Sequence, residues 1–395
     1  MSPCATAPGG ESLTVHQLIR NAAPDYLRRF GSSMPGRQRE VLKRMLACRT
    51  PDLGGQLFRC PDCSGFHYRY HSCNDRHCPQ CGQTDADQWL RSQQARLLLP
   101  VPYFLLTFTV PQELRHFIRS HQKIALDLLF ACSAQALQEL AANPRRLGAH
   151  LGMLGVLHTW SRTLIYHPHI HYLVPGGGLS PDQRRWIGAR RKFLLPVKPL
   201  GAHFRTLFKT HLQEQHPDLF KEIPAKVWKR HWNVDSRAAG SGHNALLYLS
   251  RYVFKTATSN RKVVLLPGGK LRWHYRESET GRDASIDLEA QELLRRFLQH
   301  ILPRGFTRVR TFGWLHPAAK IRANRVRALL HQAPLLSSQE QQTWDPPTDP
   351  DLPSPQPEAA PTFCREPLCP RCHRPMLLVG SWRGRQVIVY PKRPP

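Results

Sequence analysis

The chain contains few acidic residues, and this shortage limits the partners it can have. Asp and Glu number 28 among 395 residues, against 56 Lys and Arg, so the formal net charge is +28 and the pI is near 10.3. Because the basic residues are spread over the whole length, they indicate a polyanionic partner, specifically nucleic acid. No run of about 20 apolar residues occurs, and the first thirty residues lack the charged start and apolar core of a signal peptide. We therefore expect a cytoplasmic protein.

Two catalytic signatures are also missing. No Gly-rich phosphate-binding loop occurs, so ATP is not an expected cofactor. The cysteine-rich stretch near residue 70 has no His-x-Glu pair, so a zinc-bound hydroxide there would lack its proton shuttle and a deaminase is disfavoured. The eleven cysteines instead favour a structural metal, because they cluster in Cys-x-x-Cys pairs in a long basic chain without an export signal.

The first two of these pairs predict a zinc site. They are Cys60-x-x-Cys63 and Cys78-x-x-Cys81, and paired thiolates on tight turns supply the tetrahedral sulfur set that zinc prefers. The spacing favours a single site made of all four over an iron–sulfur or disulfide interpretation. Cys73 and His77 lie between the pairs, and two roles stay open for them: a second, partial site, or packing and hydrogen bonding beside the first. Arg69 and Arg76 in this module suit phosphate contacts.

A histidine-rich strand is predicted in the middle of the chain. In Tyr166–Val174 histidine alternates with other residues before the run becomes apolar, so His169 and His171 share one face of a strand. Two neutral imidazoles on one face can hold a divalent ion. His158, on the strand expected to lie alongside, is a candidate third ligand, and its alternative role is that of a hydrogen-bonded core histidine. His167 has the same parity but precedes Pro168, where the strand begins.

A helical segment downstream carries two tyrosines one turn apart. Tyr248, Tyr252 and Lys255 stand at i, i+4 and i+7 and so share a helix face. A phenol is a weak nucleophile near neutral pH, since its pKa is about 10, but it can attack a phosphodiester that a divalent ion polarises. Lys255 would neutralise phosphate charge or stabilise a phenolate. The alternative is that one tyrosine packs into the core while the other does the chemistry.

The periodicity predicts an α+β fold with a central antiparallel sheet and flanking helices, preceded by a helical and zinc-binding module. Residues 14–100 form that DNA-binding module, starting with helices 15–30 and 37–48, and residues 101–332 form the catalytic domain. Its predicted strands are 103–110, 154–160, 169–174, 192–197 and 226–234, its helices are 112–142, 202–213, 244–255 and 288–301, and a hairpin joins 262–266 to 271–276.

The C-terminal part differs in composition. Residues 334–362 contain eight prolines and neither Lys nor Arg, so we expect residues 333–362 to be a disordered acidic linker. Residues 363–395 include Cys364, Cys369, Cys372 and His373 and predict two strands within 377–390. Two interpretations stay open for these cysteines: a small zinc knuckle, or no metal, because the set is incomplete by the usual spacing.

Several of these stretches together resemble the two-tyrosine HUH transposases of the insertion sequence ninety-one family. The resemblance covers roughly residues 14–332 and is carried by His167-Pro-His-Ile-His171, Tyr248-Leu-Ser-Arg-Tyr252, Phe104-Leu-Leu-Thr-Phe-Thr-Val-Pro111, Leu157-His-Thr-Trp160, Arg295-Arg-Phe-Leu-Gln-His300 and Leu302-Pro-Arg-Gly-Phe306. It implies an N-terminal zinc-binding region, Mg²⁺ or Mn²⁺ in the catalytic site, and rolling-circle transposition of single-stranded DNA through a 5′-phosphotyrosine. It also implies a bacterial protein that acts in the cytoplasm at the nucleoid.

Two other functions fit the same residues. A plasmid or phage replication initiator or relaxase would use the same chemistry, and a replication origin rather than defined element ends would distinguish it. A non-enzymatic zinc-finger DNA-binding protein would cleave no single-stranded DNA with any metal. The DNA sequence recognised, the order in which the tyrosines act and the oligomeric state are not encoded in any pattern that we can interpret.

Overall fold

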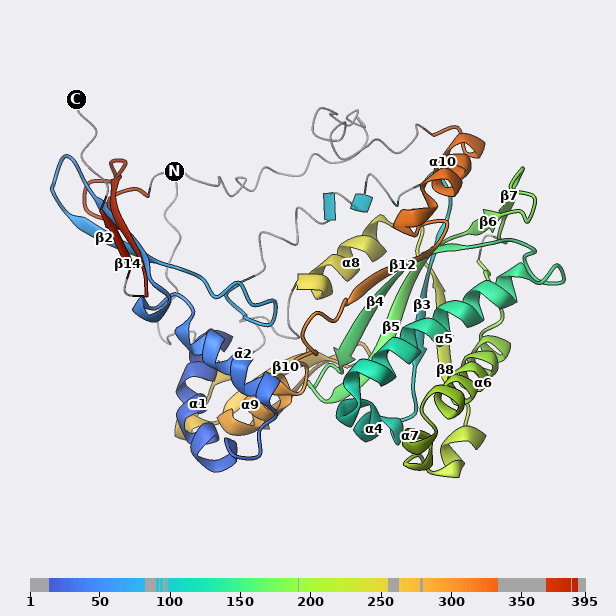
Figure 1. The fold of residues 1–395 in the computed structure, drawn as a ribbon, viewed down its shortest axis with the longest axis horizontal. Coiled ribbons are helices and arrows are strands. Elements are labelled where there is room, and N and C mark those ends of the chain that lie inside the picture. The colour runs from blue at the N-terminus through green and yellow to red at the C-terminus, as the bar shows by residue number, and fades with distance from the viewer. Residues whose placement is uncertain are drawn as a thin grey trace.

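A five-stranded antiparallel sheet forms the centre of the protein. The computed structural model describes residues 14–81, 90–91, 93–94, 97, 99–190, 192–254, 263–277, 280–332, 367–384 and 386–389. The sheet has the order β12-β4-β5-β3-β8, and helices lie on both of its faces (Figure 1). Its strands are β3 (Tyr103–Thr109), β4 (Gly152–Trp160), β5 (Tyr166–Pro175), β8 (Asn233–Ala238) and β12 (Val309–Gly313). The predicted α+β class with a central antiparallel sheet is confirmed, as is the pairing of β4 with β5.

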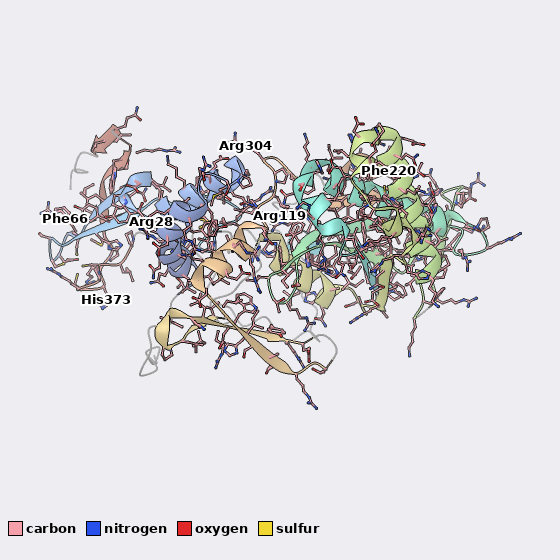
Figure 2. All side chains as sticks on the ribbon, turned by 90° about the horizontal axis from the view of Figure 1, so that it is seen from below. Arg28, Phe66, Arg119, Phe220, Arg304 and His373 are labelled. Carbon is pink, nitrogen blue, oxygen red and sulfur yellow. The ribbon has the colours of Figure 1, made fainter. Side chains whose placement is uncertain are left out.

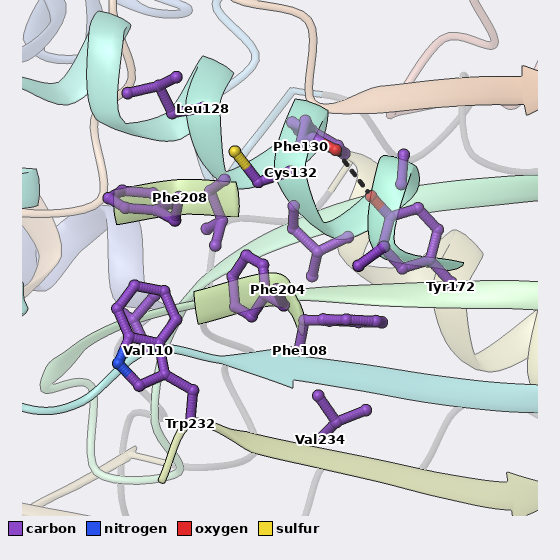
Figure 3. Close-up of a cluster of buried hydrophobic side chains, with 14 of the residues drawn as sticks. Phe108, Val110, Leu128, Phe130, Cys132, Tyr172, Phe204, Phe208, Trp232 and Val234 are labelled. Atoms are coloured by element: carbon purple, nitrogen blue, oxygen red, sulfur yellow. Dashed lines mark hydrogen bonds between the residues drawn. The ribbon is translucent and has the colours of Figure 1, made fainter. Parts of the chain in front are cut away.

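One face of this sheet carries the main hydrophobic core. Phe108, Tyr172 and Val234 point from adjacent strands into a cluster of buried aromatic and aliphatic side chains (Figure 3). The Tyr172 hydroxyl is satisfied there, because it donates to the carbonyl of Phe130 at 3.3 Å and lies 2.8 Å from Ser133 Oγ. The covering helices are α4 (Leu114–Ser120), α5 (Gln122–Ala142), α6 (Val197–Gln215) and the short α7 (Pro217–Lys221). Among the helices in the described part of the chain, α5 alone is long and apolar enough to span a membrane, and most of it is buried in this core.

The opposite face of the sheet is covered by α8 (His243–Phe254) and α10 (Lys320–Leu329). Both helices contribute to a second core, in which Leu246 of α8 and Val326 of α10 are fully buried. The short hairpin of β6 (Gly177–Leu179) and β7 (Trp186–Gly188) follows β5 at the edge of this region. The two faces therefore differ: one buries the long core helices, and the other carries α8.

The N-terminal helices pack against a distant part of the chain. α1 (Val15–Phe30) begins with a capping box between Thr14 and Gln17 and packs with α2 (Gly36–Ala47) and α9 (Ala290–Leu298). The same core includes the fully buried Trp273 of a three-stranded sheet, β11-β10-β9. These strands are β9 (Val263–Leu265), β10 (Leu271–Arg276) and β11 (Asp283–Leu288). The predicted helices at 15–30 and 37–48 and the hairpin around residues 267–269 are confirmed.

A separate four-stranded sheet joins the two ends of the chain. Its order is β14-β13-β1-β2, with β1 (Gly55–Arg59), β2 (Phe66–Tyr70), β13 (Leu377–Arg383) and β14 (Gln386–Val389). β1 pairs with β2 on one side and with β13 on the other, both antiparallel. The two strands predicted within residues 377–390 are present. They do not stand apart from the N-terminal module, because they complete its sheet (Figure 1).

Three predicted elements require correction. Residues 192–197 form no strand: Phe193 makes only an isolated bridge to Arg190, and Pro196, which has no N–H to donate to a sheet, caps α6. Residues 225–229 form a 3-10 turn after Pro224, and β8 begins only at Asn233. The apolar side chains of Val227 and Trp232, which suggested a strand, instead pack in the core beside α6. The single helix predicted for 112–142 is divided into α4 and α5 at His121.

Candidate active site and metal centres

Three histidines meet on the face of the central sheet that α8 covers. His158 of β4 lies directly opposite His169 of β5, and residues paired across antiparallel strands point to the same face. His171 lies two residues further along β5 and so shares this face. One ring nitrogen from each histidine lies within 4.8 Å of the others. The ring centroids are 4.4 Å apart for His158 and His171, 5.2 Å for His158 and His169, and 4.9 Å for His169 and His171.

Hydrogen bonds to two of these rings determine which nitrogen faces the centre. Nδ1 of His169 lies 2.7 Å from the carbonyl oxygen of His167. A carbonyl only accepts, so Nδ1–H is the donor, and in the neutral ring Nε2 keeps its lone pair. Nδ1 of His171 lies 2.8 Å from Oγ1 of Thr107 on the neighbouring strand β3. Metal-binding histidines are typically oriented in this way by a partner on the other ring nitrogen.

The environment keeps all three imidazoles neutral. Burial, reinforced by the charge of Arg115, lowers the pKa of His169 to about 4. Burial also lowers the pKa of His158 well below its ordinary value, with further contributions from His171 and His169. The pKa of His171 is lowered well below its ordinary value by burial and by His169. Neutral imidazole is the form that binds metal, so the triad is ready to hold a divalent ion at neutral pH.

Helix α8 places the tyrosine positions over the same face. Its buried residues Ala245, Leu246 and Leu249 belong to one core with residues of β4 and β5, namely Leu154, Val156 and Leu173. Val156 precedes His158 by two residues and Leu173 follows His171 by two, so this core continues along the face that carries the histidines. Positions 248 and 252 lie in α8, one turn apart. The side chains of Tyr248 and Tyr252, and Lys255 as a whole, lie outside the described residues.

The cysteines form two groups of four, which corrects the predicted single site. Cys78 and Cys81 meet Cys48 and Cys73; we call this set the core quartet. The other set, which we call the clasp quartet, brings Cys60 and Cys63 together with Cys369 and Cys372. The physical reason is the strand between the two predicted pairs. Cys60 and Cys63 lie in the β1–β2 turn, whereas Cys73 follows the far end of β2, and a strand of this length spans roughly 17 Å.

The distances within each quartet suit zinc. The Sγ atoms of Cys60 and Cys372 are 3.4 Å apart, as are those of Cys63 and Cys369. In the core quartet Cys81 Sγ lies 3.7 Å from both Cys48 Sγ and Cys73 Sγ. A zinc–sulfur bond of about 2.3 Å in a tetrahedron separates neighbouring sulfurs by about 3.7 Å, whereas a disulfide joins them at about 2.05 Å. Both quartets therefore fit a tetrahedral zinc ion.

Two protein-family models match this chain. Residues 152–323 match the family described as "Putative transposase", and residues 18–110 match the "Transposase zinc-binding domain" of IS91 type. The chain is 31% identical over 312 residues to the transposase for insertion sequence element IS801 of Pseudomonas savastanoi pv. phaseolicola, covering 73% of this chain and 70% of that protein. The chain belongs to the IS91 family of transposases. It is also 35% identical over 316 residues to the "Putative transposase y4qJ" of Sinorhizobium fredii, with 74% of this chain and 79% of that protein covered.

No solved structure matches this transposase. The zinc-binding family match and the two thiol sets together support structural Zn²⁺ in the protein. The match ends at residue 110, so it includes all of the core quartet but only Cys60 and Cys63 of the clasp quartet.

The two roles left open for Cys73 and His77 separate in the structure. Cys73 belongs to the core quartet, whereas His77 belongs to neither quartet. Nδ1 of His77 lies 2.9 Å from Asp75 Oδ1, and its Nε2 accepts from the backbone N–H of Leu302 at 3.2 Å. Burial lowers the pKa of His77 to about 4, so the ring is neutral. His77 thus links the cysteine module of the transposase to the segment that leads into β12.

Three residues of these sites were not predicted from the sequence. Cys48 ends the helical lead-in 25 residues before its partner Cys73, and no spacing rule connects them. Thr107 is one of many β-branched residues in a strand. Arg308 is buried beside Trp160, with its guanidinium carbon 5.9 Å from the ring centroid, and burial lowers its pKa to about 10, so it remains a cation near the triad. No local sequence pattern distinguishes Thr107 or Arg308 from other residues of their type.

Proposed function

We propose that this transposase nicks and rejoins single-stranded DNA at the ends of its element through a 5′-phosphotyrosine intermediate, which drives rolling-circle transposition. His158, His169 and His171 are the ligands of the catalytic ion, and Tyr248 and Tyr252 are the nucleophiles. The single observation that carries the proposal is the convergence of three neutral imidazoles beneath α8, the helix that contains both tyrosine positions.

The chemistry assigned to the chain is a transesterification. The phenolic oxygen of one tyrosine attacks the scissile phosphorus and gives up its proton to solvent. The bond from phosphorus to the 3′ oxygen breaks, and the departing 3′ oxygen takes up a proton from solvent. The products are a 5′-phosphotyrosine and a free 3′-hydroxyl. Because the number of phosphodiester bonds is conserved, no nucleotide hydrolysis is needed. A bound Mg²⁺ or Mn²⁺ would polarise the phosphate and neutralise part of its charge.

The remaining groups have supporting roles in this proposal. Lys255, one turn beyond Tyr252, neutralises phosphate charge or stabilises the phenolate. A second tyrosine one turn from the first allows a second cut while the first strand stays attached, so strand exchange needs no release. The substrate is DNA in the bacterial cytoplasm, at the nucleoid. The transposase relatives favour this function over replication initiation, which uses the same chemistry.

The test is covalent capture of labelled single-stranded element ends in the presence of Mg²⁺ or Mn²⁺. The parent protein should form an adduct that survives denaturation, each of Tyr248→Phe and Tyr252→Phe should retain some single cleavage, and the double variant should form none. Tyr275→Phe, on β10 and half-buried against the N-terminal core, is the matched control. An adduct formed by the double variant would place the nucleophile elsewhere. A parent protein that forms no adduct with any divalent ion would favour a non-enzymatic DNA-binding function.

A further inference from the structure

We propose that the four-stranded sheet is a binding surface for single-stranded DNA, built from both ends of the chain. The bases stack on an exposed aromatic face, and the C-terminal hairpin contributes to this face only when the clasp quartet holds it in place. This inference rests on the proposed function for its choice of DNA, but it concerns a surface that lies apart from the histidine triad.

The aromatic face follows from the register of the strands. Phe66, Tyr68 and Tyr70 alternate along β2 and so point to one side, and Trp382 of β13 joins them because Gly55 lies between Tyr70 and Trp382 in the same cross-strand row. The ring of Trp382 is edge-on to both tyrosines, with centroid distances of 6.1 Å to Tyr68 and 6.0 Å to Tyr70. Tyr68, Tyr70 and Trp382 therefore form one continuous aromatic surface, and Phe66 lies on the same side of β2.

This surface is accessible although it is aromatic. Phe66 is 59% exposed and Tyr68 is 53% exposed, and Figure 2 labels Phe66 and His373 at the same end of the molecule. Gly55 lets the indole lie close to the sheet, because a Cβ there would be only 2.9 Å from Cη2 of Trp382. The other side of the sheet buries Phe58 with Cys60, Cys369 and Met376, so it supplies the small core of this unit. Exposed aromatic clusters of this kind indicate a binding function.

The charge of the sheet selects a nucleic acid as the occupant. The described residues of the two hairpins, 55–70 and 367–389, include five arginines and one aspartate, with neither Lys nor Glu. A second copy of the chain is disfavoured here, since it carries the same strong positive charge. Aromatic rings within a basic surface bind single strands without sequence preference, because every base offers a face for stacking and every nucleotide a phosphate.

A cavity next to the rings extends this basic surface. It has a volume of about 510 Å³ and is lined by Arg44, Leu53, His71, Ser72, Cys73, Asn74 and Arg383. His71 and Arg383 directly follow Tyr70 and Trp382 in the sequence, so the cavity lies at the same end of the sheet as these two rings, although successive residues of a strand point to opposite sides. Arg44 is partly engaged, at 3.4 Å from Asp75 Oδ2. The lining thus offers guanidinium and imidazole groups to the phosphates of a strand whose bases lie on the rings.

The clasp quartet makes this surface depend on the C-terminal hairpin. Trp382 and Arg383 belong to β13, which contacts β1 along its length, and Cys369 and Cys372 are anchored to the β1–β2 turn. Without the metal, these contacts alone would have to hold a hairpin in which β13 is mostly half-buried and residues 386–388 of β14 are exposed. When the clasp quartet is broken, we expect β13 to detach from β1, so that Trp382 no longer lies beside Tyr68 and Tyr70.

The test measures binding of fluorescent oligothymidylate to the full-length zinc-loaded protein by anisotropy, without Mg²⁺ or Mn²⁺. Tyr68→Ala and Trp382→Ala should each weaken binding by about fivefold or more, whereas Trp382→Phe should retain most of it. Ile388→Ala is the matched control, because this exposed residue lies on the other side of the same sheet. Zinc content and thermal stability, measured for each variant, report on folding.

Disrupting the clasp quartet is the second part of the test. Cys372→Ser should lower the zinc content by one ion per chain and weaken oligothymidylate binding as much as Trp382→Ala does, and the double variant should bind no more weakly than Cys372→Ser alone. The proposal is overturned if Tyr68→Ala and Trp382→Ala bind normally, or if Ile388→Ala causes an equal loss. Dissociation of an oligomer by the variants without any change in DNA binding would instead assign the surface to protein contact. Since no cleavage is required, these outcomes are independent of adduct formation.

Discussion

The hydroxyl of Thr107 provides a sharp test of the histidine triad. It lies 2.8 Å from Nδ1 of His171, so it orients a proposed metal ligand without touching the metal itself. Thr107→Val keeps the shape of the side chain but removes this bond. Losing such an outer partner costs 10- to 100-fold in metal affinity or activity, which corresponds to about 1.4 to 2.8 kcal/mol. We expect the Mn²⁺ concentration that gives half-maximal adduct formation to rise by this factor.

The assay follows adduct formation on a labelled single-stranded end over a series of Mn²⁺ concentrations, with bound Mn²⁺ counted separately by electron paramagnetic resonance. Adduct formation by Thr107→Val should recover at saturating Mn²⁺, and Thr107→Ser should behave as the parent. Thr109→Val is the matched control. It lies on the same strand opposite His169, whose Nδ1 is bonded to the His167 carbonyl instead. An unchanged Mn²⁺ requirement in Thr107→Val, or an equal shift in Thr109→Val, would refute the assigned role of the triad.

Three further predictions concern the metals and the buried histidines. The double variant His169→Ala and His171→Ala should form no adduct while still binding DNA in a gel-shift assay, and retained cleavage would exclude these ligands. Cys78→Ser should remove one zinc ion and lower the melting temperature sharply, because the core quartet lies within the N-terminal core and structural zinc contributes folding free energy directly; two zinc ions in the variant would contradict this. Burial lowers the pKa of His300 to about 3, so the unfolded chain takes up its proton first as the pH falls below about 6.5. The contribution of His300 to the free energy of unfolding should therefore decrease by up to about 1.4 kcal/mol per pH unit between pH 6.5 and pH 3, and urea denaturation of His300→Gln should show a shallower decrease than the parent.

Local patterns were enough to predict much of the central sheet. The alternation in β5 and the apolar runs of β3 and β4 each predict a strand. All three strands pair in one sheet, where their apolar side chains are buried. Strand prediction failed where buried apolar residues lie in turns and loops instead of strands. Val227 and Trp232 are buried under α6, and their hydrophobicity does not reveal that a 3-10 turn and a loop carry them.

The histidine cluster was predictable because strand parity and strand pairing are local. The cysteine quartets were not, since each is completed by a residue far away in the sequence. Cys48 enters the core quartet from the end of α2, and Cys372 reaches Cys60 across 312 positions. Only the tertiary fold determines such partners. For the same reason, two Cys-x-x-Cys pairs with good zinc spacing lie in different sites here.

The pairing of β1 with β13 has a consequence for the order in which the protein is made. Cys60 leaves the ribosome 312 residues before Cys372, which at 5–20 residues per second is a delay of roughly 15 to 60 seconds. During this interval half of the clasp is present without its other half, and the edge of β1 that will receive β13 has no strand beside it. The outer sheet can therefore close only on a chain that has been translated past β14.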